Sequence, residues 1–311
     1  MINSSTMSRV YELIGAAFGL GATRAETAMA PSVLRQAGLF ERLQLVTKDI
    51  VDCGDAVGPT ASAPPTNPKL RYLPEYLEFS RSFIPRLERA YSNNHTPIVV
   101  GGDHSISICT LAVAAKALRE RKGKKAKLGL LWVDTHPDLN SPDTTPSGNI
   151  HGMSVAAALG RGDRALTELL GFAPKIQPES IVYVGLRDVD PPERVALKEL
   201  GIKTFTMHDI DLLGFGEVSR RAIEHVTKKS DGFVTSFDLD VCDPTIAPGV
   251  CTPIRGGLTY REAQLIMELA AAAKKLLSIE VVELNPYLDH NRITADLAIA
   301  LLESAVGKTI L

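Results

Sequence analysis

The chain alternates short apolar runs, many of them β-branched, with longer segments of helical periodicity, and this alternation constrains the fold more than any other feature. The short runs lack the polar alternation of a strand with one wet face, so both faces are expected to be covered, as in a parallel sheet. Strand–helix alternation then predicts an α/β fold, a three-layer αβα sandwich with a central, mostly parallel sheet. Because no internal repeat is visible, we expect a single domain over residues 1–311.

The apolar runs give the expected positions of the elements. Strands are predicted at Glu12–Ala17, Leu43–Ile50, Pro97–Val100, Leu128–Val133, Ile181–Val184, Phe233–Leu239 and Ser278–Leu284. Helices are predicted at Leu73–Ala90, Ser105–Arg119, Pro191–Leu200, Phe215–Lys228, Tyr260–Leu276 and Arg292–Val306. Thr259 and Glu262 have the spacing of a capping box at the start of one helix. The Pro-, Ala- and Thr-rich stretch Gly54–Lys69 is expected to be a surface loop.

Composition excludes several classes of protein. A net charge of -2 and the lack of a large Lys/Arg cluster disfavour nucleic acid as a partner. No apolar run reaches the length of roughly 18 residues that a membrane helix needs, so no membrane partner is expected. Residues Met1–Arg9 lack a signal-peptide core, and the four cysteines show no CxxC spacing. We therefore expect a cytoplasmic protein with reduced thiols.

Polar residues follow several apolar runs, where the carboxyl ends of the predicted strands lie. Ligands of open parallel sheets bind beyond those ends. Residues two apart on an extended chain point the same way, so an Asp-x-His-x-Asp motif after residue 133 and an Asp-x-Asp motif after residue 237 each gather their side chains. A Gly-Gly-Asp-His sequence follows the predicted strand Pro97–Val100, and a Glu lies near the end of the predicted strand Ser278–Leu284. The side chains expected to converge are His104, Asp134, His136, Asp138, Asp238, Asp240 and Glu283.

This set of acids and imidazoles favours a metal centre. Closely packed carboxylates repel one another strongly, and two divalent cations remove that repulsion. A ligand set of mostly oxygen, with some imidazole and no thiolate, suits manganese. Two such ions about 3.5–4 Å apart can share one hydroxide as a nucleophile. The alternative is that each motif is an ordinary turn, since Asp is common in turns, but their joint occurrence at separate strand ends favours metal.

The ordered motifs GGDHS (101–105), WVDTHPDLN (132–140), SGNIHGM (147–153), SFDLD (236–240) and EVVELNP (280–286) resemble the arginase/ureohydrolase family, and bacterial-type arginases most of all. The resemblance runs from about Leu13 to the C-terminus. It implies the arginase-like fold and two Mn²⁺ ions. It also implies hydrolysis of L-arginine to L-ornithine and urea, by attack of a metal-bridging hydroxide on the guanidinium carbon. A homotrimer or homohexamer is common in the family.

The resemblance also implies roles for individual residues. The ligands of one ion would be His104, Asp134, Asp138 and Asp238. The ligands of the other would be His136, Asp134, Asp238 and Asp240, so that Asp134 and Asp238 bridge the pair. The catalytic residues would be His151, Asp138 and Glu283. His151 would relay protons, because the leaving amine needs an acid, and Glu283 would hold the guanidinium by charge-assisted hydrogen bonds. The alternatives are a helix cap for His151 and a structural ion pair for Glu283.

Groups that would hold the far end of the substrate are also implied. The expected substrate contacts are Asn140, Thr145, Ser147, Asp188, Asp190, Glu193, Thr252 and Glu283. The first three match neutral donors to the α-carboxylate, and Asp190 matches the ammonium partner. The alternatives are an ordinary turn at residues 140–147 and an acidic cluster at the N-terminus of the helix from Pro191. Agmatine or another guanidino compound is the competing substrate.

The chain departs from the family pattern at a few positions near the predicted ligands. Pro137 lies between two ligands, where it fixes φ and removes an N–H. Val241 and Cys242 follow the last ligand, and Cys251 precedes Thr252. The two cysteines are either unrelated reduced thiols or a redox-sensitive pair. A metal-poor, arginase-like protein used for binding or assembly is a further alternative, and the retention of all the ligand types disfavours it.

Overall fold

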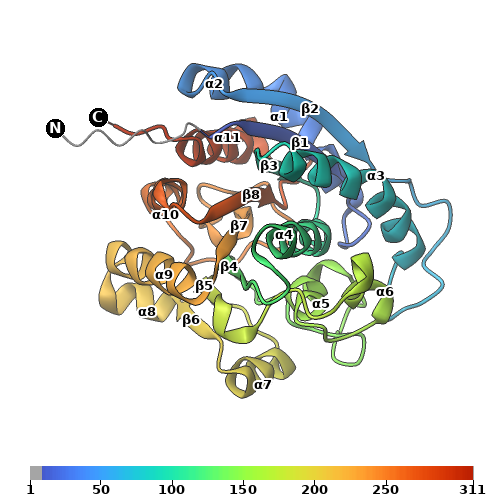
Figure 1. Cartoon of the computed structure of the whole chain (residues 1–311). Coiled ribbons are helices and arrows are strands. Elements are labelled where there is room, and N and C mark those ends of the chain that lie inside the picture. Colours follow the sequence, from blue (N-terminus) through green and yellow to red (C-terminus); the bar gives the residue numbers. More distant parts are fainter. Residues whose placement is uncertain (1–8, 311) are drawn as a thin grey trace.

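The computed structural model of the protein describes residues 9–310, and within them eight strands form one parallel sheet. The strand order is β2-β1-β3-β8-β7-β4-β5-β6, and every neighbouring pair is parallel. The strands are β1 (Tyr11–Ala17), β2 (Ile50–Val57), β3 (Thr96–Gly101), β4 (Leu128–Val133), β5 (Ile181–Leu186), β6 (Lys203–Thr206), β7 (Gly232–Asp238) and β8 (Leu276–Val282). Figure 1 shows this twisted sheet between its helices.

Helices cover both faces of the sheet (Figure 1), which confirms the predicted three-layer αβα sandwich. One face carries α1 (Ala30–Gln36), α2 (Leu39–Val46), α8 (Met207–Leu213), α9 (Phe215–Lys229), α10 (Tyr260–Ala272) and α11 (Ile293–Ala305). The other face carries α3 (Leu73–Ser92), α4 (Ser107–Lys122), α5 (Ser154–Ala158), α6 (Arg164–Thr167) and α7 (Pro191–Leu200).

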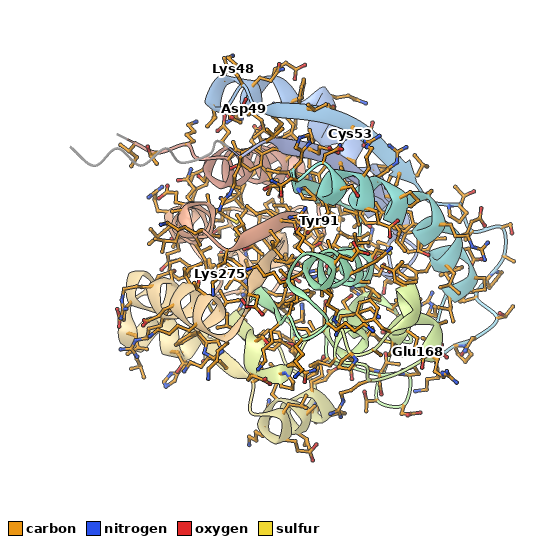
Figure 2. The ribbon with its side chains drawn as sticks, in the orientation of Figure 1. Lys48, Asp49, Cys53, Tyr91, Glu168 and Lys275 are labelled. Atoms are coloured by element: carbon orange, nitrogen blue, oxygen red, sulfur yellow. The ribbon has the colours of Figure 1, made fainter. Side chains whose placement is uncertain are left out.

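The central strands are apolar throughout because each of their faces belongs to a separate core. All residues of β4 are buried; Leu131 and Val133 pack into one core, and Leu130 and Trp132 into the other. Figure 2 shows side chains filling both spaces between sheet and helices; Tyr91 of α3, labelled there, donates its hydroxyl to Ser278 Oγ of β8 at 3.0 Å. Buried side chains of this size each contribute about 1.5–3 kcal/mol on transfer from water.

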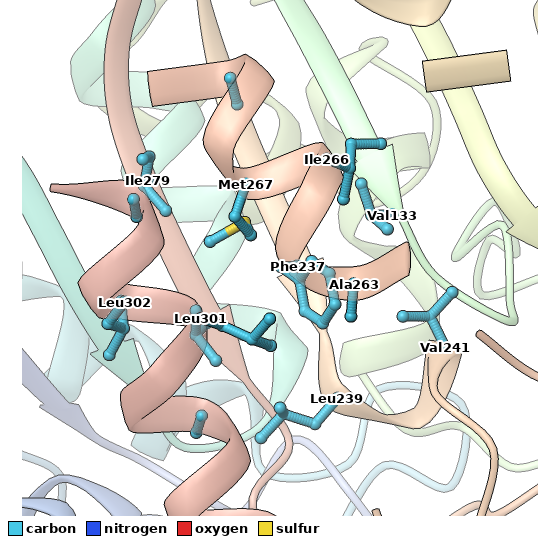
Figure 3. Packing of buried hydrophobic residues seen from close by; sticks show 14 of the residues in the cluster. Val133, Phe237, Leu239, Val241, Ala263, Ile266, Met267, Ile279, Leu301 and Leu302 are labelled. Carbon is cyan, nitrogen blue, oxygen red and sulfur yellow. The ribbon is translucent and has the colours of Figure 1, made fainter. Parts of the chain in front are cut away.

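The core beneath α10 and α11 supports the strands that end in the predicted metal ligands. Figure 3 shows Phe237 of β7 in this core, with Ala263 and Ile266 of α10 and Leu301 of α11. All four are completely buried. Because Phe237 immediately precedes Asp238, packing of its ring fixes where that carboxylate emerges from the sheet.

Most predicted elements lie where the sequence placed them, but the predicted strand at Leu43–Ile50 is wrong. Residues Leu39–Val46 form α2, whose buried Leu39 and Leu43 lie one helical turn apart, and β2 begins only at Ile50. The predicted loop Gly54–Lys69 is correspondingly wrong over its first residues, because Gly54–Val57 belong to β2. The helix predicted to reach Leu276 ends at Ala272.

Several short elements had no counterpart in the prediction, namely β6, α1, α6 and α8. The capping box of Thr259 and Glu262 is present. The expectation that Met1–Arg9 is no signal peptide concerns mainly residues 1–8, which lie outside the described part of the chain. A single domain over residues 1–311 stays a prediction. Among residues 9–310, none of the helices combines the length and apolarity needed to cross a bilayer.

Candidate functional site

The strand order brings the predicted ligands to one place. After β3 the chain crosses to β4, and β7 and β8 later fill the space between those two strands. The carboxyl ends of β3, β8, β7 and β4 are therefore neighbours. His104, Glu283, Asp238 and Asp134 lie at these four ends in turn. Ligand binding beyond the carboxyl ends of parallel strands is the common arrangement in α/β sheets.

The first group of ligand atoms surrounds the imidazole of His104. Its Nδ1 lies 3.0 Å from Asp238 Oδ2, 3.1 Å from Asp134 Oδ2 and 3.4 Å from Asp138 Oδ2. Neither His104 Nδ1 nor Asp134 Oδ2 has a hydrogen-bond partner, although both atoms are buried. Buried polar atoms are rarely left unpaired, because desolvation without a partner is costly. A divalent cation bound among these atoms would satisfy them, so the residues fit a metal ion.

The second group surrounds His136. Its Nδ1 lies 3.0 Å from Asp240 Oδ2 and 3.6 Å from Asp134 Oδ1. Asp134 thus belongs to both compact groups that can hold a metal ion, whereas Asp238 belongs only to the first. The bridging role of Asp134 therefore agrees with the geometry, and that of Asp238 stays a prediction.

The electrostatics of the site favour bound cations. Burial and the neighbouring Asp134 carboxylate raise the pKa of Asp138 well above its usual value. Burial, with Asp240 and Asp134, does the same to the pKa of Asp238. For His104, burial disfavours the charged form, but the adjacent Asp134 and Asp238 carboxylates outweigh it and raise the pKa well above its usual value. The raised pKa values of these carboxyl groups and of this imidazole show that negative charge is concentrated in the site. Bound cations would neutralise that charge.

Three residues that the sequence analysis missed contact the predicted ligands or the backbone beside them. Ser236 Oγ lies 2.7 Å from His104 Nε2, and the Trp132 ring stacks on the His104 imidazole with 4.0 Å between centroids. Arg187 donates to the carbonyl oxygens of Asp240 and Val241 at 2.8 and 3.0 Å. A signal for Ser236 and Trp132 existed, because each lies two residues before a predicted acidic ligand at the carboxyl end of its strand.

The buried Glu283 and the partly exposed His151 form a pair beside the first group. Glu283 Oε1 accepts hydrogen bonds from the His104 amide at 2.8 Å and from His151 Nδ1 at 3.0 Å. Burial opposes the charge on His151, but the bond to Glu283 outweighs it and raises the pKa of His151 to about 9. Glu283 Oε2 is buried without any hydrogen-bond partner. Because His151 contacts Glu283, its side chain serves no helix cap, and Glu283 does have an ion-pair partner.

A cavity of about 140 Å³ opens next to both ligand groups. Its lining includes every predicted substrate contact except Glu283: Asn140, Thr145, Ser147, Asp188, Asp190, Glu193 and Thr252. His136, Asp138 and His151 also face it. The residues brought together along this wall come from loops far apart in the sequence.

Three of the acids that line the cavity, Asp188, Asp190 and Glu193, differ in how many of their oxygens are free to bind a substrate. Glu193 accepts from the amides of Leu139 and Asp190, so both its oxygens are occupied, and burial raises its pKa to about 7. It forms a capping box with Asp190 at the start of α7, as the structural alternative anticipated. Asp190 Oδ2 also accepts from Asn140 Nδ2 at 3.0 Å, whereas Asp188 is more than half exposed. Glu193 therefore supports the wall, and Asp188 and Asp190 face the cavity.

The two cysteines near the site are free thiols. Cys242 is buried, and Cys251 Sγ accepts from Asn285 Nδ2 at 3.3 Å. Burial raises the pKa of Cys251 to about 12 and that of Cys242 further. Thiolate is the reactive form, so both thiols are poorly reactive at neutral pH. The raised pKa values favour two unrelated reduced thiols over a redox-sensitive pair.

The fold and the site together define an α/β protein with two His–Asp groups, able to hold metal ions, at the carboxyl edge of a parallel sheet. The model of the arginase family matches residues 10–307. The arginase of Bacillus caldovelox is 42% identical over 96% of this chain and 98% of its own, and that of Brevibacillus brevis is 41% identical over 98% and 100%. The chain belongs to the arginase family.

Solved structures agree with this membership. The native structure of the Bacillus caldovelox arginase superposes with a TM-score of 0.91 at 42% identity, covering 97% of this chain and all of that one. The Bacillus subtilis arginase structure has a TM-score of 0.89 at 40% identity, with the same coverage. The predicted family resemblance and fold are thus confirmed.

Proposed function

We propose that the chain hydrolyses L-arginine to L-ornithine and urea, using two Mn²⁺ ions held by the two His–Asp groups. The observation that carries the proposal is the buried, unpaired Glu283 Oε2 beside the first ligand group. A guanidinium ion supplies the N–H donors that this oxygen lacks. Arginine as the substrate is further supported by the relatives named arginase, which match this chain over nearly its whole length.

The proposed ligands are His104, Asp134, Asp138, His136, Asp238 and Asp240. A divalent pair bound there would supply a Lewis acid and lower the pKa of water towards neutrality. Glu283 would orient the guanidinium through Oε2, holding the guanidinium carbon near the ligand groups. His151, whose pKa of about 9 keeps it protonated at neutral pH, would donate a proton to the departing amine nitrogen.

The far end of the substrate would be held by neutral donors and by acids. Asn140, Thr145 and Ser147 line the cavity and offer amide and hydroxyl donors to an α-carboxylate. Asp190 would accept from the α-ammonium group. The Thr252 hydroxyl donates to Asp240 Oδ2 at 3.0 Å. Thr252 also lines the cavity, so it would contact the substrate from the side of the cavity on which it lies.

Agmatine is the second candidate substrate, because the cavity lining contains no Lys or Arg to pair with a carboxylate. Urea release from arginine, agmatine and other guanidino compounds, after dialysis and Mn²⁺ reloading, distinguishes the two. We expect the highest kcat/KM for arginine. A higher kcat/KM for agmatine would support the second candidate, and no urea from any of them would reject both.

Assembly and location are proposed on the family resemblance alone. We expect a homotrimer or homohexamer in the cytoplasm. Light scattering coupled to size-exclusion chromatography measures the mass directly, and a monomer at micromolar concentration would reject the proposed assembly.

A further inference from the structure

Asp138 has a backbone conformation that needs support. Its φ is +48°, in the left-handed region, which costs a residue other than glycine about 1–2 kcal/mol. The side chain is buried, and its Oδ2 lies 3.4 Å from His104 Nδ1 in the first ligand group. Such conformations persist where the surroundings hold them, and they cluster at functional sites. Whatever holds this backbone also determines where the carboxylate points.

The peptide group that precedes Asp138 is held by Tyr183 of β5. The Tyr183 hydroxyl donates to the carbonyl oxygen of Pro137 at 2.7 Å, and the tyrosine is completely buried. Because a peptide group is planar, fixing this carbonyl also fixes the N–Cα bond direction of Asp138. Pro137 has no N–H, so its carbonyl is its one polar backbone group.

The peptide group that follows Asp138 is held as well. The Asp138 carbonyl accepts from the amides of Val155 and Ala156, in the first turn of α5, at 3.0 and 3.3 Å. Both peptides that flank the Asp138 Cα are therefore anchored by groups outside the loop.

A second aromatic side chain holds the preceding residue of the same loop. Trp132 of β4 lies beside Tyr183 in the strand register, and its indole N–H donates to the His136 carbonyl at 3.3 Å. Neighbours in register lie on the same face of a sheet. The two rings thus bind successive carbonyls between the ligands His136 and Asp138.

We propose that Tyr183 is a positioning residue: its hydroxyl holds Asp138 in the left-handed conformation and so sets the affinity of the first ligand group for its cation. The inference rests on the metal centre of the proposed function. Partners that orient metal ligands through hydrogen bonds change metal affinity by about 10- to 100-fold when they are removed.

The test compares Tyr183→Phe, which keeps the ring and removes the hydroxyl, with Tyr91→Phe. Tyr91 is a matched control because it is also buried and donates one hydrogen bond, to Ser278, away from the cavity. Calorimetric titration of the full-length apoprotein with Mn²⁺ measures affinity directly. We expect one of the two binding steps to weaken about 10-fold in Tyr183→Phe and neither in Tyr91→Phe. Wild-type affinities in Tyr183→Phe, or equal losses in both variants, would overturn the inference.

A double variant tests whether Tyr183 acts through Asp138. In an Asp138→Ala background, Tyr183→Phe should change the remaining Mn²⁺ affinity less than about 2-fold, because the side chain that it orients is gone. An undiminished loss there would refute the mechanism. Tyr183→Met, of similar bulk and also without a donor, replaces Tyr183→Phe should the latter not fold.

The titration needs no turnover of arginine, so its outcome is separate from that of the proposed function. Wild-type protein that binds no Mn²⁺ would reject the metal centre itself. Wild-type protein that binds two ions, with Tyr183→Phe unchanged, would reject only the role of Tyr183. The expected loss of affinity should also be reversible: excess Mn²⁺ should restore urea release in Tyr183→Phe.

Discussion

Replacing Glu283 by glutamine gives the sharpest test of the substrate site. Glu283 is almost completely buried, and its Oε1 already accepts from the His104 amide and His151. In Glu283→Gln the amide oxygen must keep those two donors, so the NH₂ group takes the place of Oε2. A group that should accept from guanidinium N–H would then itself be a donor, facing a cation.

The size of the effect follows from the hydrogen bonds that are lost. One charge-assisted hydrogen bond contributes about 1.5–3 kcal/mol, and each 1.4 kcal/mol corresponds to about a tenfold change. Loss of one such bond therefore predicts a fall in kcat/KM for arginine of between about 10-fold and 150-fold. The repulsion between the new donor and the guanidinium favours the upper end of this range.

Glu280→Gln is the matched control for this experiment. Glu280 is an equally buried acid on β8, but its two oxygens already accept from the hydroxyls of Ser107 and Thr110. Steady-state urea release, with saturating Mn²⁺, should show a large loss in Glu283→Gln and a change of less than about 3-fold in Glu280→Gln. A Glu283→Gln enzyme within 3-fold of wild type would refute the assignment of the guanidinium to this carboxylate.

Three further predictions concern the metal, the proton donor and the stability. Removal of Mn²⁺ should lower the unfolding temperature, since each ion at 100 times its Kd stabilises by about 2.7 kcal/mol; equal melting temperatures with chelator and with Mn²⁺ would contradict this. His151→Asn should lower kcat about 100-fold or more while Mn²⁺ affinity, measured by titration, stays within 2-fold; a loss of metal instead would make His151 a ligand. Arg42→Met should cost about 1–3 kcal/mol at pH 7, because Arg42 forms two hydrogen bonds to buried Glu303. Although burial opposes its charge, Arg42 and Lys308 hold the pKa of Glu303 below its ordinary 4.5, so this cost is complete above pH 4.5 and disappears as pH falls through the lowered pKa. Urea unfolding of the wild type and of Arg42→Met across this pH range measures the difference in their free energies of unfolding. A difference that stays the same at the acid end would refute the link to the Glu303 pKa.

The success of the strand predictions has a physical cause, and so do the failures. The central strands are buried on both faces, which leaves continuous apolar runs that are visible in the sequence. The edge strand β6 is short and only partly buried, so it has no such run. The strand predicted at Leu43–Ile50 overlaps the end of α2, where the spacing of Leu39 and Leu43 fits a helix that covers the sheet.

The sequence by itself determined which chemistry is available and where along the chain it lies. Spacings of two residues after apolar strands identified His136 and the acids of both ligand groups, because such residues share one side of an extended chain. His104 was identified from the Gly-Gly-Asp-His sequence that follows another apolar strand. Their roles as ligands stay predictions until metal is measured. The alternative of an acidic cluster at the N-terminus of the helix from Pro191 placed Asp190 and Glu193 at the start of that helix, where they form its capping box.

Only the tertiary structure decided how these groups meet. The insertion of β7 and β8 between β3 and β4 makes four strand ends neighbours, and no local pattern encodes that order. Likewise, the left-handed backbone of Asp138 depends on a tyrosine of β5 and on amides of α5, which are remote in sequence. Local spacing fixes the side on which a residue points, whereas long-range packing fixes the position of that residue relative to every other strand.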